Sequence, residues 1–152
     1  MKLFADIDTN KTLALAKRKL RGYRRLLAIA GEEYTPKVTQ RITDEPRGGG
    51  GQGNATENMV LRRVQALNEL EEIDKGIAGL SDLELGVLLE KKYCTRRPQK
   101  DIVILTDFGW SEDYYYSNLK KALLEFAEVY RHGKLLVQEE VDENFLFNGD
   151  WQ

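Results

Sequence analysis

The chain has 152 residues, a formal net charge of −2 and a single cysteine, Cys94. This length fits one domain or two small modules, and the near-neutral charge excludes a bulk polycation, so nucleic-acid binding would have to rely on local basic patches. One cysteine excludes an intramolecular disulfide framework and is typical of a reducing cytoplasm, where we expect a buried, unreactive thiol.

The first predicted helix starts at Asp8 or Thr9, ends at Gly31 and is strongly basic. Leucines and Tyr23 recur in it at helical spacing and form an apolar face. Its basic face is either solvated or contacts DNA or a partner, and the sequence leaves both alternatives open. The stretch contains seven cations and no acid: Lys11, Lys17, Arg18, Lys19, Arg21, Arg24 and Arg25.

No segment of the sequence has the character of a targeting or membrane element. The opening MKLFADIDTNK lacks the apolar core of a signal peptide. No apolar run approaches the ~20 residues of a membrane span. We therefore expect a cytoplasmic protein without a membrane partner.

A glycine cluster divides the chain into parts. Residues 46–58 begin with Pro46-Arg-Gly-Gly-Gly-Gly and predict a flexible linker, because clustered glycines do not hold a helix or strand cheaply. The linker separates an N-terminal helical segment, residues 1–45, from a helical domain, residues 59–134. Within the first part, residues 34–45 predict an extended or irregular segment. Residues 135–152 form an acidic tail that should avoid DNA, although its aromatic residues could dock elsewhere.

Two helices are predicted between the linker and residue 100. The first runs from Thr56 to about Ala78, and Ser81 is expected to cap the second. The second places four residues on its inner side: Leu83, Val87, Leu88 and Tyr93. Together with the basic helix, these elements predict an all-α fold.

The stretch from residue 100 to residue 131 predicts two helices joined by a glycine turn. Asp101–Phe108 is long enough for a short helix, and Gly109 suits a turn with positive φ. Ser111 is a good N-cap for a second helix that His132-Gly133 stops. This is the helix-turn-helix plan, whose second helix can enter the DNA major groove. An ordinary helical hairpin is the alternative. Packing between the two helices is assigned to Ile104, Phe108, Trp110, Tyr115 and Leu119.

Nine residues are candidate DNA contacts. The lysines and arginines can neutralise phosphates, Ser117 and Asn118 can hydrogen-bond to base edges or phosphates, and the two outer tyrosines can contact sugars or thymine methyl groups. Tyr115, between them, is expected to face inward. The candidates are Arg96, Arg97, Lys100, Tyr114, Tyr116, Ser117, Asn118, Lys120 and Lys121.

The sequence predicts neither an enzyme nor a metal or cofactor site. The single histidine, His132, lies at a predicted helix C-terminus, where a cation stabilises the helix dipole. It cannot form a metal site with Cys94 alone, and no Cys/His spacing is typical of zinc. No activated nucleophile or base is visible.

Several pieces, in this order, resemble known transcription regulators. They are Leu3 to Asp8, Tyr23-Arg-Arg-Leu, Pro36-Lys-Val-Thr, Leu80-Ser-Asp-Leu-Glu-Leu-Gly-Val-Leu-Leu-Glu-Lys-Lys-Tyr, Asp101-Ile-Val-Ile-Leu-Thr-Asp-Phe-Gly-Trp-Ser-Glu and Lys121-Ala-Leu-Leu-Glu-Phe-Ala-Glu. The last pieces look like the sigma-factor region that reads the −35 promoter element. Over nearly its full length the chain resembles, more closely, the ArpU family of phage-encoded regulators.

The resemblance implies a DNA-binding activator of phage late genes for packaging, morphogenesis or lysis, which reads double-stranded DNA with the helix at 111–131. Host RNA polymerase and a second copy of the chain are further candidate partners. A helical adaptor that binds host RNA polymerase without DNA specificity of its own is the alternative. Leu105 replaces the usual small residue of the motif, and Tyr115 replaces a smaller apolar one, so base contacts are not transferred from sigma factors.

Overall fold

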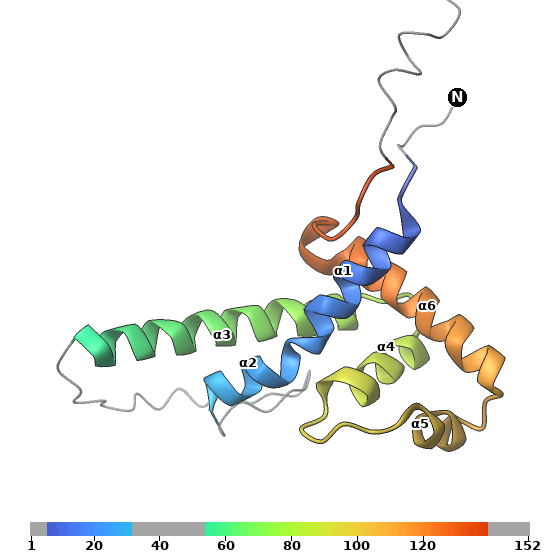
Figure 1. Ribbon diagram of the computed structural model, residues 1–152, viewed down its shortest axis with the longest axis horizontal. Helices are drawn as coiled ribbons and strands as arrows, with labels where there is room; N and C mark the ends of the chain where they lie inside the picture. The colour runs from blue at the N-terminus through green and yellow to red at the C-terminus, as the bar shows by residue number, and fades with distance from the viewer. Residues whose placement is uncertain (1–5, 32–53, 140–152) are drawn as a thin grey trace, which may run out of the picture.

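A computed structural model of the chain describes residues 6–31 and 54–139 (Figure 1). These ranges contain six α-helices, two short helical turns and one isolated bridge between Ile7 and Gln138, without other β structure. The predicted all-α fold is confirmed. The segment at 34–45 and the glycines of 46–53 lie outside the described residues. The elements are α1 (Thr9–Arg21), α2 (Tyr23–Ala30), α3 (Asn54–Ala78), α4 (Leu83–Leu89), the π-turn η1 (Glu90–Cys94), α5 (Asp101–Phe108), α6 (Glu112–Val129) and the 3-10 turn η2 (Tyr130–His132).

The basic N-terminal segment forms two helices where the sequence predicted one. Asp8 is the N-cap, and its side chain accepts a hydrogen bond from Lys11 N at 3.0 Å. The break falls at Gly22, whose N–H donates to Lys19 O at 3.2 Å in a tighter turn. Glycine weakens a helix interior because its backbone loses more conformational freedom on folding than that of other residues. As a result α1 packs along α6, and α2 packs along α3 (Figure 1).

Helix α3 extends past the end of α2. It starts at Asn54, two residues before the predicted cap and inside the predicted linker. The sequence predicts an apolar stripe on this helix. Leu70, Ile73 and Ile77 of the stripe are buried, whereas Val60 is 56% exposed. Val60 is exposed because α2 is shorter than α3. Helix α2 ends at Ala30, and Gly31 after it lies beside the Arg63 guanidinium, so α2 does not pack against the first turns of α3.

The prediction that Leu83 faces inward is wrong. Asp82 caps α4 by accepting a hydrogen bond from Glu84 N, so Leu83 is the first helical residue and is 84% exposed. Leu88 and Leu89 follow Leu85 by three and four residues, so the three share the buried side, and Leu83 lies off it. The predicted inward positions of Leu88 and Tyr93 are confirmed.

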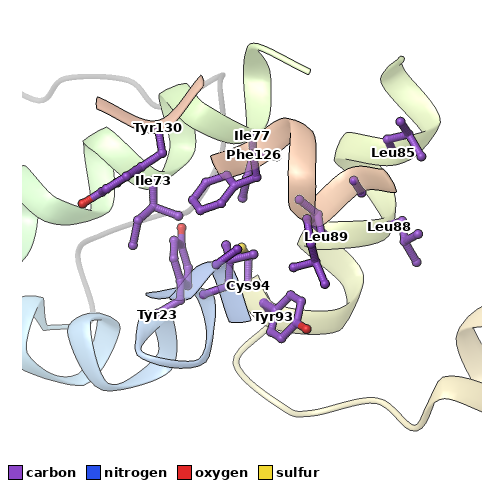
Figure 2. Packing of buried hydrophobic residues seen from close by; sticks show 14 of the residues in the cluster. Tyr23, Ile73, Ile77, Leu85, Leu88, Leu89, Tyr93, Cys94, Phe126 and Tyr130 are labelled. Carbon is purple, nitrogen blue, oxygen red and sulfur yellow. The ribbon is translucent and has the colours of Figure 1, made fainter. Parts of the chain in front are cut away.

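One core joins α1, α2, α3, α4 and α6. Figure 2 shows Tyr23, Ile73 and Phe126 pointing toward one another, with Leu89 and Cys94 alongside. The Tyr23 hydroxyl donates to Asp74 Oδ1 at 2.8 Å, which satisfies its polar end. Cys94 is buried, as predicted, and burial raises the pKa of its thiol, which disfavours the reactive thiolate.

A polar cluster at the edge of this core ties α1 to α3 and η2. Glu69 accepts from Arg131 Nη2 at 2.9 Å and from the Tyr130 hydroxyl, and lies 3.1 Å from Lys19 Nζ. Partial burial works against ionisation, but the hydrogen bonds from Tyr130, Arg131 and Lys19 outweigh it and lower the pKa of Glu69 from 4.5 to about 2.

This shift predicts an acid-dependent loss of stability that Glu69→Gln should remove. The unfolded chain takes up the proton near pH 4.5 and the folded chain only near pH 2, so the contribution is complete above pH 4.5 and is lost as the pH falls to 2. Because solvent reaches the cluster, where the side chains of Lys19, Glu69 and Arg131 are 34%, 21% and 38% exposed, we expect this contribution to be on the order of 1–2 kcal/mol.

Denaturant unfolding of both proteins between pH 7 and pH 2 measures the effect. The difference in unfolding free energy between wild type and Glu69→Gln should shrink below pH 4.5. A difference that stays constant across this range would contradict the assignment.

Candidate DNA-binding surface

Helices α5 and α6 are joined by a three-residue turn with the local signals that the sequence predicted. Gly109 has φ 70° and ψ 28°, in the left-handed region that favours glycine. Its N–H and that of Trp110 donate to Thr106 O and Leu105 O, which closes the end of α5. Ser111 caps α6 by accepting a hydrogen bond from Tyr114 N at 3.2 Å.

Aromatic rings fill the angle between the two helices. Phe108 and Trp110 stack with ring centroids 4.2 Å apart, and Tyr114 meets Trp110 edge-on at 5.1 Å. Ile104 and Tyr115 are fully buried beneath them. The five residues assigned to this packing are thus all buried or half-buried, and they hold α6 in a defined direction relative to α5.

A polar network underneath the turn was not anticipated. The hydroxyl of Tyr115 donates to Asp101 Oδ1 at 2.6 Å, and Lys92 Nζ reaches the same oxygen at 2.5 Å. Burial opposes the charge, but the bonds from Lys92 and Tyr115 lower the pKa of Asp101. The network joins η1, α5 and α6. Asp101 and Lys92 are separated by one turn and a loop, so no helical spacing in the sequence pairs them.

The outward face of α6 carries the predicted contact residues. Tyr114 is 53% exposed and Tyr116 is 47% exposed, and Ser117, Lys120 and Lys121 are exposed as well. No carboxylate among the described residues forms an ion pair with either lysine. Asn118 differs from the others, since it is half-buried and its Nδ2 donates to Tyr114 O at 2.8 Å.

The cations before α5 fall into two groups. Lys91 lies 4.0 Å from Asp107 and 5.0 Å from the centre of the Phe108 ring, and Lys92 is held by Asp101, so both serve internal contacts. The three predicted contacts Arg96, Arg97 and Lys100 are exposed in the loop that leads to α5.

Arg24 has a role that the sequence did not indicate. Its Nε donates to Thr95 O at 2.8 Å, and its Nη2 donates to Lys92 O at 2.9 Å. These bonds attach α2 to the start of the loop at 95–100. Figure 1 shows this loop passing from the end of η1 to α5, with the first turn of α6 on the far side of α5. One of the seven N-terminal cations thus positions the loop that carries Arg96 and Arg97.

Other kinds of site are not visible in the described part of the chain. Residues 6–31 and 54–139 contain no group of three or more His, Cys, Asp or Glu side chains placed to hold a metal ion. Their helices include none with the length and apolar character needed to cross a membrane. His132 is exposed after α6, with φ 58°.

The chain is similar to proteins of two bacterial or phage sources that carry the same name. It is 39% identical over 136 residues to a protein of Streptococcus phage O1205 named "Putative autolysin regulatory protein ArpU", and the match covers 90% of this chain and 99% of the relative. A protein of the same name from Enterococcus hirae is 27% identical over 136 residues, which cover 90% of this chain and 98% of the relative. No protein-family model matches the chain, and no solved structure does.

Proposed function

Because the chain belongs to the ArpU family of autolysin regulatory proteins, we propose that it is a phage or prophage regulator that binds double-stranded DNA with α6. Its role is activation of late genes, for packaging, morphogenesis or lysis. The name of the relatives supports regulation, and the outward face of α6 supports DNA as the partner.

The observation that carries the proposal is the combination of a fixed turn with an exposed, unpaired cationic face. Trp110 and Tyr115 are anchored, so α6 presents its outer side chains from a rigid base. Lys120 and Lys121 lack carboxylate partners among the described residues, so phosphates do not have to displace an existing ion pair. Arg96, Arg97 and Lys100 are further exposed cations, in the loop before α5.

Each class of side chain then has a separate task. The five cations bind phosphates and give affinity that depends on salt. Base edges and sugars are contacted by Ser117 and by the neighbouring Tyr114 and Tyr116. These contacts give specificity for the DNA sequence. Asn118 contributes its carbonyl oxygen or its second N–H, because one N–H of its amide group already donates to the helix backbone. No cofactor or metal takes part in this scheme.

The test of phosphate binding uses Lys120→Ala and Lys121→Ala. Each variant should weaken binding to every DNA sequence and reduce the slope of log affinity against log salt by about 0.9, the value for one phosphate. Lys134→Ala is the matched control, because Lys134 is an exposed lysine beyond α6 and should leave the slope unchanged. Fluorescence anisotropy with DNA from the regulated region, at several salt concentrations, measures these values.

Ser117→Ala forms the second arm of this experiment. It should narrow the affinity gap between the preferred site and random DNA by about 1–3 kcal/mol and leave the salt slope unchanged. If both lysine variants and Ser117→Ala fold normally and bind DNA like wild type, α6 does not read DNA. The adaptor that binds host RNA polymerase would then replace this proposal.

A further inference from the structure

A groove between α1, α2 and α3 is a second surface with defined chemistry. Its volume is about 490 Å³. Its apolar lining comes from Leu15 of α1, Leu26 and Ile29 of α2, and Leu135 after η2. Leu15 is 36% exposed, and Leu26 and Ile29 are half-buried, so apolar surface remains open to an occupant.

Two arginines on the rim of the groove select the charge of that occupant. Arg18 and Arg25 line the groove and are exposed, and no carboxylate of residues 6–31 or 54–139 forms an ion pair with them. The neighbouring Lys19 is already paired with Glu69 at 3.1 Å. The groove therefore suits a segment that combines acidic residues with large apolar side chains.

The last thirteen residues of the chain have this composition. Residues 140–152 contain four acids and no Lys, Arg or His, and their large apolar residues include Phe145, Leu146, Phe147 and Trp151. Their attachment point is near the groove. Leu135 lines it, and the Glu139 N–H donates to Asp6 O at 2.8 Å, beside the start of α1.

The distance along the chain allows docking without any movement of the helices. A helix rises about 1.5 Å per residue, so Leu15 lies about 9 Å along α1 from Thr9, and the three residues from Asp6 to Thr9 add at most about 10 Å. Six residues, from Glu139 to Phe145, span up to about 20 Å. Covalent attachment also gives the segment a high effective concentration at the groove.

We propose that residues 140–152 dock into the groove of their own chain, with their aromatic residues against Leu15, Leu26 and Ile29 and their acids facing Arg18 and Arg25. This docking is independent of the role of α6. It would shield two of the seven N-terminal cations from phosphates and from acidic partners.

The fluorescence of Trp151 in the full-length protein tests the proposal. Subtracting the spectrum of Trp151→Phe from that of wild type isolates Trp151, because both proteins retain Trp110. We expect emission shifted to the blue of free N-acetyltryptophanamide and protection from acrylamide. Arg18→Glu/Arg25→Glu and, separately, Leu15→Glu should move the emission to the red and remove the protection.

Two comparisons make this experiment specific. Lys120→Glu/Lys121→Glu changes the net charge by the same amount at residues that do not line the groove, and it should leave Trp151 protected. Leu15→Glu replaces a partly exposed residue, so it preserves the fold, as melting curves can verify. In wild type, 1 M salt should weaken the docking, because the ion pairs are at the surface and are screened.

Three results would overturn the proposal. Trp151 could have the emission of free N-acetyltryptophanamide in wild type. It could be protected in wild type and in both groove variants alike, which would place the tail elsewhere. Its protection could also fall on dilution, which would mean that the tail occupies the groove of a second copy.

Discussion

Tyr115→Ala should lower the free energy of unfolding by about 3–5 kcal/mol, the usual cost of removing a buried aromatic ring. The side chain is fully buried at the junction of α5 and α6, where its ring packs and its hydroxyl donates to Asp101. Alanine would leave a cavity and remove a donor from the Asp101 carboxylate, which Lys92 also holds. Thermal and denaturant unfolding measure this loss directly.

Tyr115→Phe separates the two contributions. It keeps the ring and removes only the hydroxyl, so it should cost about 1.5–3 kcal/mol, the range for a hydrogen bond to a charged group. Tyr114→Phe is the matched control, because this neighbouring ring is 53% exposed, and it should be close to wild type. Equal stability of Tyr115→Phe and wild type would mean that the bond to Asp101 does not stabilise the fold.

Phe126→Ala should also lower the free energy of unfolding by about 3–5 kcal/mol. In addition, it should reverse the sign of the effect that Gly76→Ala has on stability. A Cβ atom added at Gly76 would lie 2.8 Å from Phe126 Cε2, closer than real contacts allow. Phe126 is fully buried between α3 and α6, so its ring cannot move aside freely. In the wild-type background the overpacking caused by Gly76→Ala is therefore expected to destabilise the protein by about 1–3 kcal/mol. The higher helix propensity of alanine offsets part of this loss.

In the Phe126→Ala background the same Gly76→Ala change should be stabilising by about 1 kcal/mol. The clash is gone, and the better helix propensity of alanine remains. A double-mutant cycle of denaturant unfolding measures this change of sign. Additive effects of the two substitutions would show that Gly76 is not required for the close approach of α3 and α6.

The part of the candidate surface that could be predicted was the part with local causes. Gly109 and Ser111 act within one turn of the chain, and the spacing of Tyr115, Leu119 and Phe126 places them on one face of a single helix. The bounds of α5 and α6 therefore agree with the sequence prediction within about two residues, the usual uncertainty of helix ends. Leu83 was misplaced because Leu85, Leu88 and Leu89 recur at spacings of three and four residues and occupy the buried face, and Leu83 lies off that face.

The sequence could not predict which lysines and arginines already have partners within the folded protein. Lys91, Lys92, Arg96, Arg97 and Lys100 form one basic patch in the sequence, yet the first two have carboxylate partners in α5. Similarly, Arg24 belongs to a basic helix by spacing, but it donates to the carbonyl of Thr95, 71 residues away. DNA contact by the remaining cations stays a prediction.

The sequence by itself determined the all-α class, the glycine turn and cap between α5 and α6, and the inward direction of Tyr115, because capping and helical periodicity act over a few residues. Three features were decided only by the tertiary structure. The first is the break at Gly22, after which α1 packs against α6 and α2 against α3. The others are the bonds from Lys92 and Tyr115 to Asp101 and the bonds by which Arg24 holds the loop before α5. These features depend on which elements meet in the folded chain, and such long-range contacts have no fixed spacing in the sequence.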